Sequence, residues 1–190
     1  KRVDLGGGLG IPYKSGDSPA PPSDYAQMIR EVTEGLGLQV ILEPGRVIAG
    51  NAGVMVSQVL YHKQAPDRTF MIIDAGMNDL MRPALYQAHH DILPLDKPGE
   101  DAAMVTYDIV GPICESTDKF AAQRSMPEVA PGARVAFMSA GAYGAVLSSQ
   151  YNARPLVAEV LVDGHQYALV RRRPSFEEMT QLEQMPAWLD

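Results

Sequence analysis

The first part of the chain combines short apolar runs with one helical pattern. The short runs 3–5 and 39–42 predict two buried strands, the first ending at a glycine turn and the second at a Pro-Gly turn. Between these runs, apolar side chains recur at helical spacing over residues 25–36, with Ser23 or Asp24 in position to cap the helix. The order strand, turn, helix and strand is typical of parallel α/β architecture.

The pattern changes after residue 50 to short β-branched runs separated by Gly, Pro and Asp. Such runs predict a mostly antiparallel β domain, either a barrel or a sandwich. The predicted strands cover residues 54–63, 69–74, 104–110, 134–138, 156–162 and 166–172. Asp163 and Gly164 are typical of a tight turn, so we expect them at the tip of a hairpin formed by the last two strands.

Few segments of this second part have the length and spacing of a helix. We expect helices over residues 78–90 and 139–149, and a terminal helix over residues 175–184. Ser175 and Glu178 stand at the spacing of a capping box, which predicts the start of the terminal helix.

These patterns divide the chain into three predicted parts. Residues 1–49 hold about one and a half βα units, and if these are the last units of a TIM-like (β/α)8 barrel, which takes about 250 residues in total, the rest of that barrel would lie outside this chain. The chain therefore looks like the C-terminal portion of a longer protein. Residues 50–175 are expected to form the β domain, and residues 176–190 a C-terminal helix and tail.

Composition and charge restrict the classes of function. The 190 residues include 16 basic and 23 acidic side chains, and this net charge of −7 argues against nucleic acid and acidic membranes as partners. No apolar run approaches the roughly 18–20 residues that cross a bilayer. A single cysteine cannot form an intrachain disulfide, so the expected compartment is the reducing cytoplasm. The histidines and this cysteine lack metal-ligand spacing and predict no metal site; His89 and His90 are expected at the surface or an interface.

Two loops carry candidate chemistry. Gly6-Gly7-Gly8 follows the first strand, where backbone N–H groups can bind a phosphate, although an ordinary glycine turn is the alternative. Glu43-Pro44-Gly45-Arg46 ends the second strand, at the edge where parallel barrels bind ligands. Gly45 allows close approach and Arg46 offers a planar fork to an anion, whereas the alternative is a Pro-Gly turn with a surface ion pair.

Six segments carry a more specific resemblance: DLGGGLGIPY (4–13), EPGRVIAGNAGV (43–54), DAGMNDLMRPALY (74–86), GPICES (111–116), AGAYG (140–144) and YNARP (151–155). In this order they resemble the diaminopimelate decarboxylases, pyridoxal-phosphate enzymes of the alanine-racemase-like fold group. The similarity extends to the PAWL ending at residues 186–189. The family's first barrel units, with the lysine that forms a Schiff base with the cofactor, are absent from this chain.

The resemblance implies a site for pyridoxal 5'-phosphate. Decarboxylation leaves a carbanion that the cofactor ring delocalises, and a carboxylate beside the ring nitrogen favours the protonated form of that nitrogen. A glutamate in the family's EPGR segment has this role, so the resemblance assigns it to Glu43 as a catalytic residue. The residues implied to bind the cofactor are Gly7, Gly8, Glu43, Pro44, Gly45, Arg46 and Tyr143.

The resemblance also assigns a catalytic role to Cys114, as the acid that reprotonates the α-carbon after CO2 leaves. A thiol is mostly protonated at neutral pH, as a proton donor must be. In the family this loop crosses the interface of a homodimer with shared active sites, so Cys114 would serve the partner subunit. The alternative is a small buried hydrophobic side chain.

The implied substrate is meso-diaminopimelate, which has a second amino-acid head distant from the reacting carbon. The carboxylate of this head suits an arginine fork, and its ammonium group suits a glutamate. The residues implied to bind the substrate are Arg46, Arg82, Tyr86, Glu115 and Tyr143. For Arg82 the alternative is a solvated cation before Pro83, for Tyr143 it is a half-buried core tyrosine, and Arg154 remains unassigned.

The full enzyme would therefore convert meso-diaminopimelate to L-lysine and CO2. The chain alone is expected to be inactive, because the Schiff-base lysine and most of the barrel are missing. One alternative is a related decarboxylase of a carboxylated polyamine or a basic amino acid. Another is a non-catalytic regulatory homologue, against which the presence of Glu43, Arg46, Cys114 and Tyr143 argues.

Overall fold

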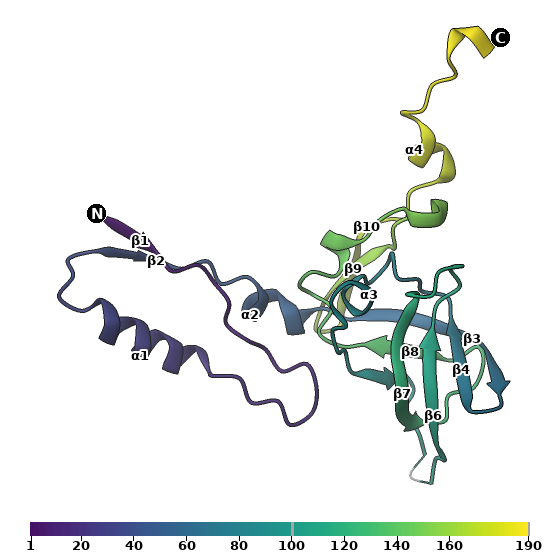
Figure 1. The fold of residues 1–190 in the computed structure, drawn as a ribbon, viewed down its shortest axis with the longest axis horizontal. Helices are drawn as coiled ribbons and strands as arrows, with labels where there is room; N and C mark the ends of the chain where they lie inside the picture. The colour runs from purple at the N-terminus through teal and green to yellow at the C-terminus, as the bar shows by residue number, and fades with distance from the viewer. Residues whose placement is uncertain (100, 190) are drawn as a thin grey trace.

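The structure is a computed structural model that describes residues 1–99 and 101–189. Its N-terminal part contains β1 (Arg2–Asp4), α1 (Pro22–Thr33) and β2 (Gln39–Ile41) and lies to one side of a larger sheet domain (Figure 1). β1 and β2 pair in parallel. The predicted order of strand, turn, helix and strand is therefore confirmed.

The start of α1 differs from the prediction. Pro21 occupies the N-cap position and no side chain caps the helix, so Ser23 and Asp24 lie inside the first turn. Proline suits the first helical turn because its φ is already helical and its missing N–H has no intrahelical partner there. Pro22 therefore begins the helix earlier than the apolar spacing predicted.

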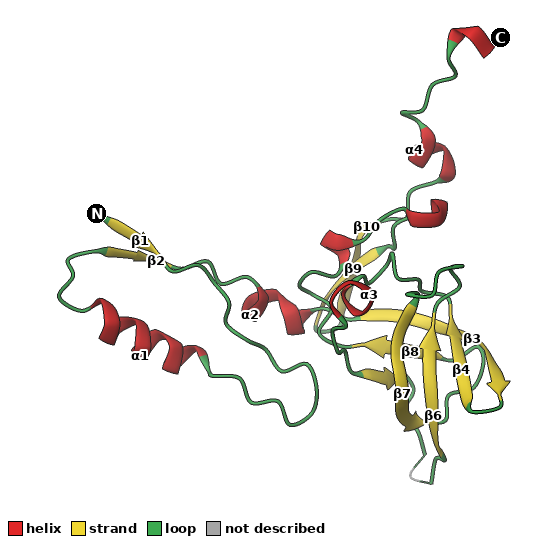
Figure 2. Ribbon diagram, in the orientation of Figure 1, coloured by secondary structure: helices red, strands yellow, loops and turns green. Residues whose placement is uncertain are grey.

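The sheet domain, whose strands are yellow in Figure 2, contains a six-stranded sheet in the order β5-β8-β3-β4-β6-β7. Its strands are β3 (Met55–Ala65), β4 (Arg68–Ile73), β5 (Ile92–Pro94), β6 (Met104–Val110), β7 (Lys119–Pro127) and β8 (Arg134–Phe137). The first half of β3 pairs with β8 and the second half with β4, which curls the sheet into a nearly closed barrel around Val59, Met71 and Phe137. Of the two predicted alternatives, the structure confirms the barrel. Its sheet is mixed, because β4 and β6 pair in parallel while the other neighbouring strands pair antiparallel.

Two strands of this sheet were not predicted. β5 is only three residues long, and β7 mixes small and polar side chains instead of β-branched ones. β7 also bends where Gln123 adopts a φ of 49° and its N–H donates to the buried carboxylate of Asp108. Pairing with β6 therefore holds β7 in the sheet despite its weak intrinsic pattern.

The predictions of helices over residues 78–90 and 139–149 are largely wrong. Only α3 (Arg82–Tyr86) forms within residues 78–90, and Gln87 ends it with a left-handed φ of 53°. Within residues 139–149 only the 3-10 turn η2 (Ala145–Leu147) forms, because Tyr143 has a φ of 56° and interrupts a helical path. The loops that carry the family resemblance thus replace the expected helices.

The remaining elements are short. α2 (Arg46–Ala49) and η1 (Gly50–Ala52) connect the N-terminal part to β3, and η3 covers Tyr151–Ala153. β9 (Glu159–Asp163) and β10 (Gln166–Arg171) form a separate antiparallel sheet, with Gly164 and His165 as the hairpin loop, one residue later than predicted. None of the helices in the described residues is long and apolar enough to cross a membrane.

The C-terminal segment extends away from the sheet domain (Figure 1). It contains α4 (Phe176–Thr180) and η4 (Ala187–Leu189). The predicted capping box is confirmed, since Ser175 and Glu178 exchange both hydrogen bonds. The helix is shorter than the predicted range of 175–184, and residue 190 of the predicted tail lies outside the described residues.

Candidate functional site

The two predicted ligand-binding loops lie side by side. The backbone N–H of Glu43 donates to the carbonyl of Gly6 at 2.8 Å, so the loop after β2 continues along the loop after β1. A Cβ atom on Gly7 would collide with the carbonyl oxygen of Glu43. Glycine at position 7 is therefore what allows the two loops to touch, while Gly8 has a φ of 88° that favours glycine as well.

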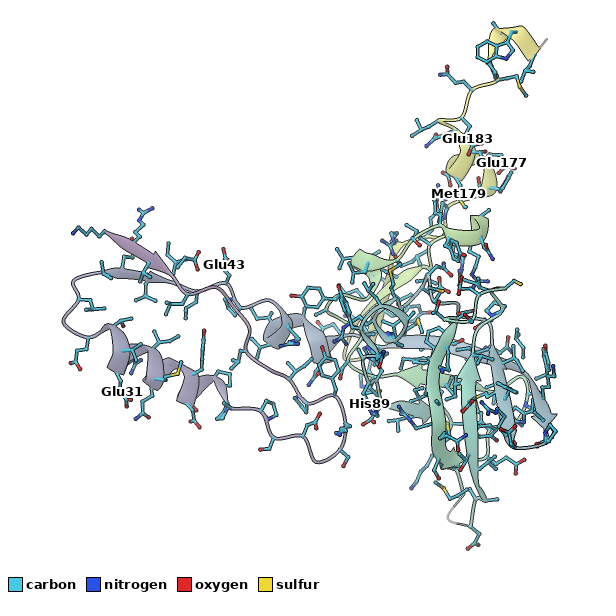
Figure 3. All side chains as sticks on the ribbon, in the orientation of Figure 1. Glu31, Glu43, His89, Glu177, Met179 and Glu183 are labelled. Atoms are coloured by element: carbon cyan, nitrogen blue, oxygen red, sulfur yellow. The ribbon has the colours of Figure 1, made fainter. Side chains whose placement is uncertain are left out.

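Two charged side chains on the second loop have no side-chain partner among the described residues. Neither the carboxylate of Glu43 nor the guanidinium of Arg46 forms a hydrogen bond or an ion pair with any side chain in residues 1–99 and 101–189. Glu43 is exposed on the loop after β2, whereas Arg46 is half-buried at the start of α2 (Figure 3). Two unpaired charges of opposite sign beside a glycine loop are suited to a ligand with an anionic and a cationic end.

The loop that carries Tyr143 packs against the segment just after Arg46. The N–H of Ala140 donates to Gly53 at 2.8 Å and that of Gly141 donates to Gly50 at 3.0 Å. A Cβ atom on Gly141 would collide with the carbonyl oxygen of Ala49, the last residue of α2. The sheet domain thereby presents Tyr143, which is 51% exposed, on a loop held against the α2 segment.

Arg82 is buried rather than solvated. Its Nη1 lies 2.9 Å from Nε2 of His90, and its guanidinium carbon lies 4.5 Å from the centre of the Tyr13 ring. No carboxylate in the described part of the chain lies within ion-pair distance of Arg82, although only 9% of the residue is exposed. The predicted alternative of a solvated cation is therefore wrong. Tyr86, at the end of α3, is 62% exposed.

Cys114 and Glu115 stand on an exposed loop that one buried carboxylate supports. Asp118, which is 3% exposed, accepts hydrogen bonds from the N–H of Ile113 at 2.6 Å and of Met77 at 2.7 Å. Burial raises the pKa of Asp118, while the two backbone N–H groups oppose that shift. The buried-hydrophobe alternative for Cys114 is wrong, since the cysteine is free and exposed.

The carboxylate of Glu115 is held by its own loop. Hydrogen bonds from the backbone N–H of Thr117 and the hydroxyl of Ser116, both at 3.3 Å, lower the pKa of Glu115. The side chain is therefore kept in its charged form. No hydrogen bond or ion pair in the described residues links Cys114 or Glu115 to the loops around Glu43 and Arg46.

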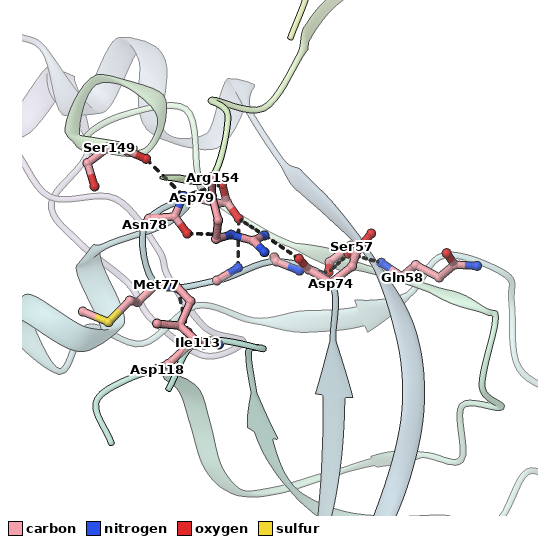
Figure 4. Close-up of polar contacts among 12 residues, drawn as sticks. Ser57, Gln58, Asp74, Met77, Asn78, Asp79, Ile113, Asp118, Ser149 and Arg154 are labelled. Carbon is pink, nitrogen blue, oxygen red and sulfur yellow. Dashed lines mark hydrogen bonds and ion pairs between the residues drawn. The ribbon is translucent and has the colours of Figure 1, made fainter. Parts of the chain in front are cut away.

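A polar cluster that sequence reasoning left unassigned joins the loop of residues 74–79 to residues 149–154 (Figure 4). Arg154 donates to the side chain of Asn78 at 3.1 Å, to the carbonyl of Asp74 at 2.7 Å and to Asp79 at 3.2 Å. Asn78 in turn donates to the carbonyl of Ser149 at 3.0 Å. The only signal in the sequence was Arg154 itself, in the segment YNARP.

His90 was placed wrongly by the sequence analysis. It is 1% exposed and lies between Arg82 and the carbonyl of Met138, at the back of the Arg82 site. The hydroxyl oxygen of Tyr13 is also buried and has no hydrogen-bond partner among the described residues. In the part of the chain that the structure describes, no group of His, Cys, Asp and Glu side chains is arranged to hold a metal ion.

Comparison with known proteins identifies relatives of this arrangement. A diaminopimelate decarboxylase from Zymomonas mobilis is 49% identical over an alignment of 191 positions, which covers 98% of this chain and 44% of that protein. The crystal structure of diaminopimelate decarboxylase from Helicobacter pylori complexed with L-lysine superposes with a TM-score of 0.86 at 40% identity, covering 95% of this chain and 44% of that one. The structure from M. jannaschii in co-complex with L-lysine gives a TM-score of 0.91 at 34% identity, covering 100% and 44%.

The chain thus spans less than half the length of these relatives, 44% in each case. The family model described as the C-terminal sheet domain of pyridoxal-dependent decarboxylases matches residues 14–141, which include the whole six-stranded sheet and the loops around Arg82 and Cys114. The chain therefore belongs to the pyridoxal-dependent decarboxylase family, whose C-terminal sheet domain it contains.

Proposed function

We propose that this chain is the C-terminal part of a diaminopimelate decarboxylase, which converts meso-diaminopimelate to L-lysine and CO2. The three relatives named above, at 34–49% identity, support this activity. Residues 1–49 would be the last units of the catalytic barrel, because β1 and β2 are parallel and a helix connects them. The remaining strands of that barrel and the lysine that binds the cofactor would come from the rest of the protein.

The loops around Glu43 fit pyridoxal phosphate. Close contact between Gly7 and Glu43 leaves a cradle without side chains, and Arg46 has no competing partner among the described residues, so both are available to a phosphate. The free carboxylate of Glu43 would hold a proton on the nitrogen of the ring. When bound, the cofactor supplies the electron sink for decarboxylation. Tyr143, Pro44, Gly45 and Gly8 would complete the binding surface.

The burial of Arg82 is the observation that supports diaminopimelate as the substrate. A buried guanidinium without a carboxylate partner among the described residues is unfavourable unless a ligand supplies an anion. The second head of diaminopimelate carries such a carboxylate, whereas ornithine and arginine have no carboxylate away from the reacting carbon. The ammonium group of this head would bind the charged Glu115, and Tyr86 would line the same end of the substrate.

Cys114 would donate the proton to the α-carbon in the active site of the partner subunit. Its exposed loop has no polar link to the cofactor loops of its own chain within the described residues, which suits a contribution across a dimer interface. Asp118 would keep the loop in place through Ile113. The assembly would therefore be a homodimer with shared active sites.

The test of the proposed function is Arg82→Met in the full-length enzyme. Loss of a bidentate, charge-assisted contact should lower kcat/KM for meso-diaminopimelate by about 10²-fold, mainly through KM. Arg134→Met, which removes an exposed arginine of β8, serves as the matched control and should leave both parameters unchanged. A folded Arg82→Met enzyme with wild-type KM would show that Arg82 does not bind the distal carboxylate of the substrate.

A further inference from the structure

The hydrogen bonds of His90 determine its protonation state. A guanidinium can only donate, so Nε2 of His90 must accept the bond from Arg82 at 2.9 Å. A carbonyl oxygen can only accept, so Nδ1 must carry the proton that it donates to Met138 at 2.8 Å. His90 is therefore a neutral imidazole with its hydrogen on Nδ1.

This imidazole is the only hydrogen-bond acceptor that holds the Arg82 guanidinium among the described residues. The Tyr13 ring contacts the guanidinium 4.5 Å from its centre and packs edge-on against His90, with ring centres 5.6 Å apart. The other guanidinium nitrogens have no partner in the described part of the chain. Arg82 is thus fixed at one nitrogen and remains available for an anion at the others.

A second arginine fixes His90 itself. Nη1 of Arg124, on β7, donates to the backbone carbonyl of His90 at 3.0 Å, and Nη2 approaches the neighbouring His89 ring at 3.3 Å. With the bond from Nδ1 to Met138, the histidine is held from two sides of the sheet domain. A rotation of the ring toward a different partner would break its bond to Arg82 or its bond to Met138.

We propose that His90 is a positioning residue that sets the selectivity for the distal carboxylate of the substrate, by holding Arg82 through a neutral imidazole acceptor. This inference rests on the proposed function, since it takes Arg82 to be the group that reads that carboxylate. A carboxylate in place of His90 would pair with Arg82 and neutralise it. A neutral acceptor orients the guanidinium, and the positive charge of Arg82 remains available to pair with the carboxylate of the ligand.

The experiment compares two competitive ligands that differ by one carboxylate. L-lysine keeps the distal head of the substrate, whereas 1,5-diaminopentane lacks its carboxylate. Their inhibition constants are measured against meso-diaminopimelate in the full-length enzyme, and the ratio of the two constants reports recognition of the carboxylate. A general loss of packing would raise both constants and leave the ratio unchanged.

Two amide variants distinguish the roles of the two ring nitrogens of His90. His90→Gln keeps an acceptor near the position of Nε2 and should retain the wild-type ratio within about threefold. His90→Asn keeps a donor near Nδ1 but cannot reach Arg82, and it should reduce the preference for L-lysine by about tenfold or more. His90→Phe should behave like Asn, and His89→Phe, at the exposed neighbouring histidine, should leave the ratio unchanged.

The outcomes distinguish this inference from the proposed function. A wild-type enzyme that binds 1,5-diaminopentane as tightly as L-lysine would contradict the role of Arg82, and with it the proposed substrate. A wild-type preference for L-lysine that persists in His90→Asn and His90→Phe would overturn the positioning role of His90 alone. If His90→Phe cannot be purified, the contrast between the Gln and Asn variants decides the question.

Discussion

Arg154 and Asp79 form an ion pair at 3.2 Å in which the carboxylate side chain is 2% exposed and the guanidinium 28%. The pair joins the segment after η3 to the loop that precedes Arg82. Arg154 also donates to the carbonyl of Asp74 at the end of β4. The Asp79 carboxylate also accepts hydrogen bonds from the N–H of Gly76 and the side chain of Asn78, so Arg154 is its counterion rather than its sole donor.

Arg154→Met should destabilise the full-length enzyme by about 2–4 kcal/mol, because it leaves the buried carboxylate of Asp79 without its counterion. The measurement is the midpoint of urea denaturation. Arg171→Met is the control, since its ion pair with Glu159 is partly exposed and its loss should cost less than about 1 kcal/mol. Equal losses in the two variants would contradict a structural role for the Arg154 cluster.

Cys114→Ala in the full-length enzyme should lower kcat by about 10²–10⁴-fold, the usual loss for a general acid, with little change in KM. Glu115→Gln should instead raise KM, because it removes the charge that would meet the distal ammonium group. Steady-state kinetics with meso-diaminopimelate separates these effects. An increase of KM alone in Cys114→Ala would contradict its role as proton donor.

Mixed dimers test whether Cys114 acts across the subunit interface. Subunits with Cys114→Ala are mixed with subunits that lack the cofactor-binding lysine, both inactive as homodimers. If each site takes its lysine and thiol from different chains, random mixing should restore about a quarter of the wild-type activity. No recovery despite measured subunit exchange would mean that both residues act within one chain.

Acid pH should destabilise the protein through His90. Burial is the main cause that lowers the pKa of His90 below its ordinary value of 6.5, with Arg82, Arg124 and His89 acting in the same direction and the Met138 carbonyl opposing them. Between the lowered pKa and 6.5 the unfolded chain binds more protons than the folded one, so stability falls as the pH falls through this window. Above it, His90 adds no pH dependence.

Denaturation midpoints of the full-length enzyme at about pH 7.5 and about pH 5 measure this effect. The fall in stability toward acid should be smaller in His90→Gln than in the wild type, because an amide does not titrate. Asp91 bonds to His89 at 2.8 Å rather than to His90, so the comparison isolates the buried ring. The same pH dependence in both proteins would contradict a neutral buried His90.

The sequence predicted local structure well where side chains follow a simple alternation. The bounds of β6 agree with the predicted range 104–110, and the capping box of Ser175 was found from spacing alone. β7 was missed because residues 119–127 contain few β-branched side chains and are held by pairing with β6. The predicted helix over 139–149 failed because the left-handed Tyr143 depends on contacts between distant loops.

In the candidate site, too, local motifs were visible in the sequence and contacts between distant segments were not. Short motifs pointed to Glu43, Arg46 and Cys114, because their residue types and resemblance are visible within a few positions. The supporting residues were not visible in this way: Arg154 meets Asp79 across 75 positions of the chain, and its partners emerge only from the fold. His90 lies eight positions from Arg82, yet only the turn after α3 brings the two side chains together.

The chain expressed alone should aggregate or require a partner. Leu42 and Ile48, beside Glu43 and Arg46, are 41% and 70% exposed, and Leu161 and Tyr167 of the β9–β10 hairpin are 64% and 81% exposed. Apolar surface of this extent marks contacts with other protein. Size-exclusion chromatography checks this expectation; a monomeric 190-residue species that melts cooperatively would contradict it.

We propose that this chain completes an enzyme that recognises a carboxylate distant from the reacting carbon. The most direct measurement is the release of CO2 by the full-length enzyme with pyridoxal phosphate from meso-diaminopimelate, L-ornithine and L-arginine at equal concentrations. The structure around Arg82 predicts rapid release from meso-diaminopimelate and kcat/KM values at least about 10²-fold lower for the other two. Equal or faster release from ornithine or arginine would contradict the selection of a distal carboxylate by this enzyme.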